Sequence, residues 1–227
     1  MTAPEERSAP LTIATWVPYV FPFVLFLLLT GPVRFFPQWS PFLYVTKTIL
    51  VGGLLWIWRQ AYAEDFFRGL CFREVLTAVL CGLLVLALWV APDGYLPQLG
   101  RNPGFDPFLL TGSRARATGL IAMRLLGAAV VVPVMEELFW RSFLMRYLIN
   151  RDFCSVPMGT FTWSSYLAVA VLFGLEHHRI VEGVVAGLLY GLLVVRQKKL
   201  AGAIVAHGIT NLGLGIYVIA TGSWMFW

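Results

Sequence analysis

Charged residues are scarce in this sequence: they make up 13% of its 227 residues, whereas a soluble domain carries about 25%. Hydrophobic residues reach 59%, and the mean hydropathy is +0.75. This composition excludes a disordered or collagen-like chain and argues against a water-soluble globule. At about 20 residues per span, the chain is long enough for about six to eight membrane helices.

Cysteine and long basic runs are also scarce. Cys71, Cys81 and Cys154 lie in or beside apolar segments and show no CxxC spacing, which indicates neither a disulfide framework nor a thiolate metal site. The net charge is +5, yet the densest basic segment is only Arg196–Lys199. We therefore expect no nucleic-acid partner, and we interpret the excess positive charge as orientation charge beside a bilayer.

Long apolar segments are what the sequence has in abundance. We predict an all-α, polytopic membrane bundle of seven to eight spans, forming a single domain over residues 1–227 with its motif-bearing core at about 119–220. Residues 92–118, rich in Pro and Gly, predict an irregular loop. The apolar segments are about Leu11–Leu29, Pro41–Trp58, Val75–Ala91, Gly119–Met145, Thr160–His177, Gly183–Val195 and Leu200–Trp224.

Positive charge predicts the orientation of the chain in the membrane. Nine Lys and Arg residues fall on the side of the N-terminus and five on the other side, so we expect the N-terminus inside and the C-terminus outside. The inner residues are Arg7, Arg59, Arg68, Arg73, Arg146, Arg151, Arg196, Lys198 and Lys199, and the outer ones are Arg34, Arg101, Arg114, Arg116 and Arg179.

Gly183, Gly187 and Gly191 form a ladder of small residues four apart. Such a ladder lets two helices approach closely, either within one bundle or between two copies of a chain. We expect a contact within the bundle, and we keep self-association through these glycines as the alternative.

Ionisable residues within a span are functional candidates, because an unpaired charge is costly in the membrane. The first group is Glu136, Glu137 and Arg141. Glu137 and Arg141 are four apart, so they can pair on one helical face. Glu136 points about 100° away and has no local counter-ion. It is therefore the candidate base that takes a proton from water.

The second group surrounds His177. Phe173 and His177 are four apart and share one face of the predicted helix. His178 and Arg179 lie near the predicted membrane boundary, where such residues are unremarkable. Glu176 is placed either to pair with Arg179 or to support His177, and the sequence leaves its role and that of His178 open.

The third group is His207 and Asn211, which share one face of an apolar helix where both need partners. If the three groups of residues converge at one point, two chemistries fit the arrangement. In the first, Glu136 and His177 activate a water. His207 and Asn211 then donate hydrogen bonds to the oxyanion of a tetrahedral intermediate.

In the second chemistry, His177, His207 and a glutamate bind zinc and leave a position open for water. HExxH is absent from the sequence, so zinc has no independent support, and we expect no metal or cofactor. The span ends drawn above also place His177 about 12–15 Å from the depth of Glu136 and His207. Either the fifth segment begins later than Thr160, or its helix enters deeply from the inner side.

Three classes of protein compete at this stage. A hydrolase would use water, since neither GxSxG nor a Cys–His arrangement is present in the spans. A non-catalytic immunity or binding protein would keep the polar residues for helix packing. A proton-coupled transporter would use them as a relay, but such proteins more often show internal repeats or paired broken helices, which we do not find.

The motifs Glu136-Glu137-xxx-Arg141, Phe173-xxx-His177 and His207-xxx-Asn211 lie in this order on separate apolar segments. Together they resemble the type II CAAX prenyl protease family, which also covers bacteriocin-processing and immunity-type membrane proteins of bacteria. The resemblance spans about Leu120 to Ile219, and all three motifs match without substitution. The segment 173–179 and the Gly-rich helix after it are also similar to a bacterial subgroup associated with exosortase and PEP-CTERM sorting.

This resemblance implies an integral protein of about eight spans in a bacterial cytoplasmic (inner) membrane, with intramembrane endopeptidase activity by a glutamate mechanism. The partners would be the bilayer and a peptide or protein substrate at the membrane, with no prenyl group implied. Glu136 and His177 would activate water, and His207 and Asn211 would hold the oxyanion. The supporting residues would be Glu137, Arg141 and Phe173.

Overall fold

The computed structural model describes residues 15–66, 69–100 and 104–227, and within these ranges every regular element is a helix. The predicted all-α class is therefore confirmed. The longer elements are α1 (Val17–Thr30), α2 (Ser40–Ile57), α4 (Phe72–Val90), the continuous helix α6–α8 (Arg114–Tyr147), α9 (Trp163–Leu175), α10 (Ile180–Gln197) and α11 (Ala201–Thr221).

Five helical segments are long and apolar enough to cross a membrane. They comprise α2 with the turn before it, α4, α6–α8, α10 and α11. The helices α1 and α9 are apolar but shorter, and the predicted start of the first span at Leu11 lies outside the described residues. The chain is thus an integral membrane protein, while the count of seven to eight spans stays a prediction.

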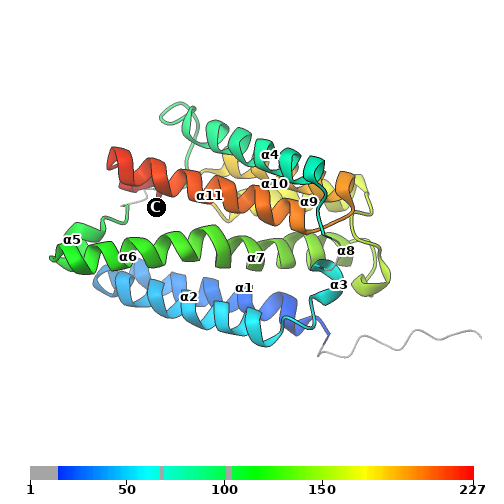
Figure 1. The fold of residues 1–227 in the computed structure, drawn as a ribbon, viewed down its shortest axis with the longest axis horizontal. Coiled ribbons are helices and arrows are strands. Elements are labelled where there is room, and N and C mark those ends of the chain that lie inside the picture. Colours follow the sequence, from blue (N-terminus) through cyan, green and yellow to red (C-terminus); the bar gives the residue numbers. More distant parts are fainter. Residues whose placement is uncertain (1–14, 67–68, 101–103) are drawn as a thin grey trace, which may run out of the picture.

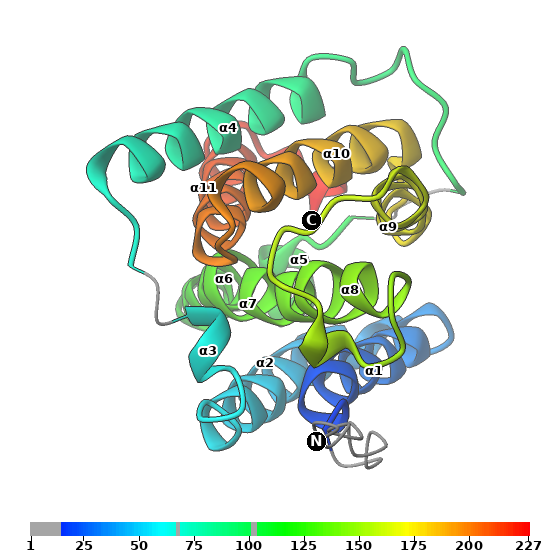
Figure 2. The same ribbon diagram turned by 90° about the vertical axis from the view of Figure 1, so that its right-hand side faces the viewer.

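The long helix α6–α8 lies in the middle of the bundle (Figures 1 and 2). The pair α1 and α2 covers one side of it, and α4, α9, α10 and α11 form a group on the other side. The described chain begins at one end of the bundle and reaches its C-terminus at the opposite end (Figure 1). We call these the N-terminal end and the C-terminal end.

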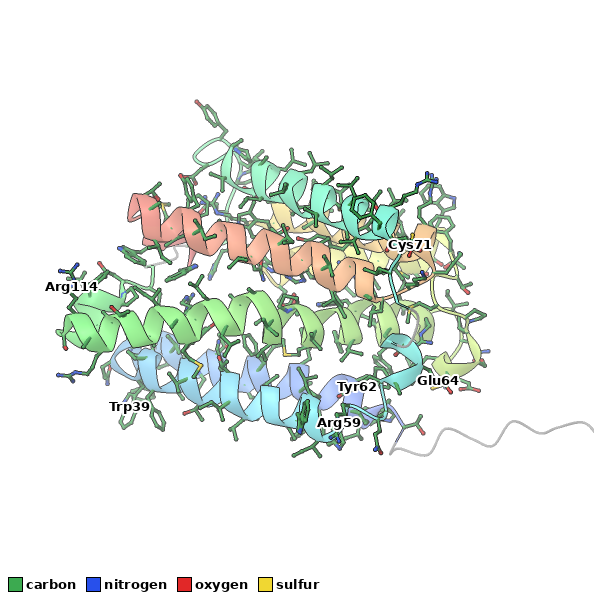
Figure 3. The ribbon with its side chains drawn as sticks, viewed as in Figure 1. Trp39, Arg59, Tyr62, Glu64, Cys71 and Arg114 are labelled. Atoms are coloured by element: carbon green, nitrogen blue, oxygen red, sulfur yellow. The ribbon has the colours of Figure 1, made fainter. Side chains whose placement is uncertain are left out.

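Polar and aromatic side chains mark both ends of the bundle. Figure 3 shows Tyr62 and Glu64 at the N-terminal end, and Trp39 and Arg114 at the C-terminal end. Between the ends, large apolar side chains such as Leu28, Leu80 and Ile216 are exposed on the outer faces of helices. An apolar exterior between two polar ends is what a bilayer requires of a helical bundle.

The interpretation of residues 92–118 as irregular is wrong in its second half. The short helix α5 (Pro107–Thr111) begins after Asp106, whose Oδ1 accepts hydrogen bonds from the backbone N–H groups of Phe108 (2.9 Å) and Leu109 (3.3 Å). Asp at the N-cap followed by Pro in the first turn is a strong helix start. The long helix then begins at Arg114, five residues before the predicted Gly119.

Two π-helical turns interrupt the long helix, at Gly127–Val131 and Leu138–Leu144, on either side of α7 (Val132–Glu137). In the first turn the N–H of Val132 donates to the carbonyl of Gly127, five residues back. In that register the carbonyl of Ala128 faces Pro133, which has no N–H to donate. The sequence thus leaves one carbonyl in the middle of the bundle for a donor from another helix.

The glycine ladder of α10 packs against α9. A Cβ atom on Gly183 would lie 2.9 Å from the Cα of Gly174, and one on Gly187 would lie 2.9 Å from the Cα of Ala170. On Gly191 it would lie 2.9 Å from the ring of Tyr166. The contact within the bundle is therefore confirmed. Self-association through these glycines does not fit the structure, because α9 already occupies their face.

Candidate active site

The four side chains predicted to carry the chemistry line one cavity of about 190 Å³. Glu136 comes from the long helix, His177 from the turn between α9 and α10, and His207 and Asn211 from α11. The structure therefore brings together four residues that are up to 75 positions apart in the sequence. Further side chains of the wall are Tyr44, Trp89, Arg124, Phe173, Tyr190 and Phe226.

The mismatch in depth calculated for His177 is not present in the structure, and the fifth segment does begin later than Thr160, at Trp163. The ring of Phe173 lies 4.8 Å from that of His177 and 5.9 Å from that of His207, so both histidines lie beside the same aromatic ring. The helix α9 begins at Trp163 and ends at Leu175, so His177 follows the helix instead of lying within it. Counting along one straight helix from Thr160 therefore does not give its depth.

Glu136 is buried without a strong partner. Its side chain is 5% exposed, and its Oε2 atom makes no hydrogen bond to the residues that the structure describes. Its one ion-pair contact among them is with Nε2 of His207, at 4.0 Å. Glu136 lines the cavity, and a buried carboxylate oxygen without a protein donor needs a donor such as water.

Glu137, the next residue, is fully buried and strongly paired. Its Oε1 atom accepts hydrogen bonds from Nη1 of Arg141 (3.0 Å) and from Nδ1 of His207 (2.9 Å). The predicted pairing of Glu137 with Arg141 is thus confirmed. The Arg141 guanidinium also packs over Phe173, 4.4 Å from the centre of the ring. We call Glu137, Arg141 and His207 the Glu137 cluster.

The hydrogen-bond partners assign a tautomer to each histidine, because a carboxylate or a carbonyl can only accept. Nδ1 of His207 bonds to the Glu137 carboxylate, so it carries a hydrogen and Nε2 points toward Glu136. Nδ1 of His177 bonds to the carbonyl of Phe173 at 2.7 Å. It also carries a hydrogen, which leaves Nε2 of His177 with a free lone pair in the neutral ring.

Asn211 has a partner that the sequence analysis did not foresee. Its Nδ2 atom donates to the carbonyl of Ala128 at 2.9 Å, the carbonyl that Pro133 cannot pair. One N–H of the amide therefore joins α11 to the long helix, and the second N–H has no partner among the residues that the structure describes. Asn211 thus has a structural bond in addition to its place in the cavity wall.

The other residues of the second motif are arranged differently from the prediction. Glu176 pairs with neither candidate partner but accepts a hydrogen bond from Nε1 of Trp140 at 3.3 Å. Arg179 is buried and forms ion pairs with Asp93 and Glu182, so it is more than a boundary residue.

His178 is exposed, as a boundary residue would be. Its Nδ1 hydrogen-bonds to the carbonyl of Leu99 at 2.8 Å, and the N–H of Leu99 donates to its backbone carbonyl at 2.7 Å. These contacts hold the loop after α4 against the turn that carries His177.

Sequence reasoning missed several residues of the cavity wall, among them Tyr190 and Arg124. Tyr190 stacks on His207, with ring centres 5.0 Å apart and planes 19° apart, and its hydroxyl donates to Oγ1 of Thr210 at 2.7 Å. Arg124 lines the cavity nearer the C-terminal end of the bundle. An arginine inside the apolar run of the fourth segment was the signal that could have identified it.

Within residues 15–66, 69–100 and 104–227, no three His, Cys, Asp or Glu side chains are arranged so that they could hold a metal ion. The alternative zinc set of His177, His207 and a glutamate is thus not assembled as such a group in the described residues.

Residues 118–213 match a family described as type II CAAX prenyl endopeptidase Rce1-like. The match covers the long helix, α9, α10 and the first half of α11, and therefore all four cavity residues of the prediction. It confirms the family resemblance inferred from the three motifs, while the exosortase-associated subgroup stays a prediction. No curated protein and no solved structure matches the chain.

Proposed function

We propose that this protein is an intramembrane endopeptidase that hydrolyses a peptide bond of a membrane-associated protein or peptide. The observation that carries the proposal is that Glu136 is buried without a hydrogen bond at Oε2 from the described residues and lines a cavity with His177, His207 and Asn211, whereas Glu137 is paired with Arg141 and His207. The match of residues 118–213 to an endopeptidase family supports it.

In the proposed reaction Glu136 takes a proton from a water, and Nε2 of His177 accepts a hydrogen bond from the same water and orients it. The water oxygen bonds to the carbonyl carbon of the substrate, and the carbonyl electrons move onto its oxygen. When this tetrahedral intermediate collapses, the carbon–nitrogen bond breaks and Glu136 returns the proton to the leaving nitrogen.

The oxyanion needs donors at a fixed place. Asn211 has one N–H left after its bond to Ala128. His207 donates from Nε2 only when its ring is fully protonated, since Nδ1 already donates to Glu137. We propose that the Glu137 carboxylate stabilises this imidazolium, so Glu137 and Arg141 act as positioning residues and Phe173 holds both the arginine and His177 in place.

We also propose that α1 and α9 cross the membrane with the five longer segments, which makes seven crossings. An odd number of crossings agrees with the chain ends at opposite ends of the bundle (Figure 1). Arg59, Arg73 and Arg146 lie toward the N-terminal end, so the proposed inner face is that end of a bacterial inner membrane. The proposed mechanism uses no metal or other cofactor.

The test compares the proteins of membrane fractions from cells that contain either the wild-type chain or Glu136→Gln. We expect new peptide termini in one or more membrane proteins with the wild type and not with the variant. A matched control is Glu176→Gln, which changes a neighbouring carboxylate that has its own partner, Trp140. Identical termini in all three samples would contradict the proposal and favour a non-catalytic immunity protein or a transporter.

A further inference from the structure

Arg124 is a half-buried cation of the cavity wall. Among the residues that the structure describes, no carboxylate lies within ion-pair distance of it, and its guanidinium makes no hydrogen bond to any of them. The buried arginines, in contrast, all have ion-pair partners. Arg141 pairs with Glu137, Arg146 with Asp65, and Arg179 with Asp93 and Glu182.

Aromatic rings hold this guanidinium in place. Its central carbon lies 4.2 Å from the ring centre of Phe105, 4.6 Å from that of Tyr44 and 5.3 Å from that of Trp227. The aromatic rings stabilise the positive charge of the guanidinium. Its N–H donors lie in the plane of the guanidinium and need acceptors of their own. The group is therefore held between rings, and its N–H donors make no hydrogen bond to the residues that the structure describes.

A second cation adds to the positive potential of this region. Nζ of Lys47 lies 5.1 Å from the centre of the Tyr44 ring and donates to Oγ1 of Thr30, a neutral partner. No described carboxylate pairs with Lys47 either. The part of the cavity around Tyr44 is thus electropositive and aromatic, whereas the other part holds the carboxylate of Glu136. An anion that entered the cavity would be attracted to Arg124.

We propose that Arg124 binds a carboxylate of the substrate peptide, and this inference rests on the proposed endopeptidase function. The planar guanidinium forms two parallel hydrogen bonds with a carboxylate, which gives both affinity and register. Arg124 and Glu136 are twelve positions apart on one helix, or about 18 Å. An extended peptide covers that length in about five residues, so the recognised carboxylate lies about five residues from the scissile bond.

Binding of peptide pools tests the assignment without requiring hydrolysis. The pools are photo-crosslinkable apolar peptides of about six residues, a length that spans the estimated distance. One pool has a free C-terminal carboxylate, one has a C-terminal amide, and one is amidated but carries Asp near that end. The proteins, reconstituted in phosphatidylcholine vesicles, are the Glu136→Gln chain and the same chain with Arg124→Gln, Arg124→Lys or Arg116→Gln.

With Arg124 present we expect the free-acid pool to label the protein about tenfold more than the amide pool. Arg124→Gln should bring that ratio to about one, and Arg124→Lys should retain part of it. Arg116 is exposed on the same helix, so Arg116→Gln removes an equal charge and should leave the ratio unchanged. Labelling by the Asp pool would assign the site to an acidic side chain, and its absence would assign it to the peptide terminus.

Equal or absent labelling by the acid and amide pools in the chain that retains Arg124 would overturn the inference, and this comparison does not depend on how any Arg124 variant folds. A preference that persists in Arg124→Gln would also overturn it. Because the proteins in this test do not need to cleave the peptides, its failure is distinguishable from failure of the proteomic test of Glu136.

Discussion

Glu136 and Glu137 are adjacent in sequence, but their surroundings are opposite in chemistry. Glu137 belongs to the Glu137 cluster, and Glu136 lines the cavity. In the cluster, one carboxylate oxygen accepts from both Arg141 and His207, at 3.0 and 2.9 Å. Oε2 of Glu136, in contrast, has no hydrogen-bond partner among the residues that the structure describes. The helix separates them, because consecutive side chains point about 100° apart.

The difference shows how a membrane bundle keeps one carboxylate reactive beside another that is not. A carboxylate that accepts hydrogen bonds from an arginine and a histidine is fixed in position, so it can orient His207. A carboxylate without such donors can take a proton from water, and burying it costs free energy. The bundle thus fixes Glu137 through contacts within the long helix and with α11, and it leaves Glu136 for water.

The largest expected effect on activity is that of Glu136→Gln. The amide is nearly isosteric but cannot take a proton from water, so we expect turnover to fall by at least about 10²–10⁴-fold. Thermal unfolding in detergent should be close to that of the wild type, because no protein hydrogen bond to Oε2 is lost. Normal turnover by this variant would remove Glu136 from the mechanism.

Glu137→Gln should instead act on stability. The change leaves the buried Arg141 without its counter-ion, and breaking a buried pair in this way costs about 3–5 kcal/mol. We expect a low yield of folded protein and early unfolding, measured by the same thermal assay. If Glu136→Gln and Glu137→Gln reduced activity and stability to the same extent, the contrast between the two carboxylates would be wrong.

Asn211→Ala is expected to lower turnover by about 10²–10³-fold, the usual effect of removing one oxyanion donor. It should also cost about 1–3 kcal/mol of stability, because the carbonyl of Ala128 loses its donor. Asn211→Asp should be at least as damaging, since it puts a negative charge beside both that carbonyl and the oxyanion. Near-normal cleavage by Asn211→Asp would exclude the oxyanion role.

Pro133→Ala separates the two roles of Asn211. Alanine at this position restores a backbone N–H within reach of Ala128, so the double variant Pro133→Ala, Asn211→Ala should regain part of the lost stability. Its turnover should stay as low as that of Asn211→Ala alone. Recovery of turnover together with stability would show that Asn211 matters only as a bond between α11 and the long helix.

The smallest expected effect is that of removing metal. In the proposed mechanism Glu136 and His177 act on water directly, so activity in purified membranes should be unchanged after prolonged chelation. If zinc were catalytic, chelation would remove it and abolish activity, and added zinc would restore activity. About one bound zinc per chain, with activity that follows it, would replace the glutamate mechanism with the zinc alternative.

The sequence was sufficient to predict much of this arrangement. Its scarcity of charge and its apolar segments predicted a helical membrane bundle, because a bilayer admits few other structures. The four-residue spacing of Glu137 and Arg141 predicted their ion pair, and the spacing of the glycines predicted a close helix contact. These features are local, so helical geometry alone relates residue numbers to positions in space.

Only the tertiary structure decided how residues from different helices meet. Asn211 reaches the carbonyl that Pro133 leaves unpaired, and Glu137 reaches His207, seventy positions away. His207 lies beside the ring of Phe173, which the four-residue spacing had already placed next to His177, and Arg124 lies among rings from three other segments. Such contacts depend on where helices end, bend and cross, and these are set by packing of the whole bundle, which local spacing in one segment does not encode.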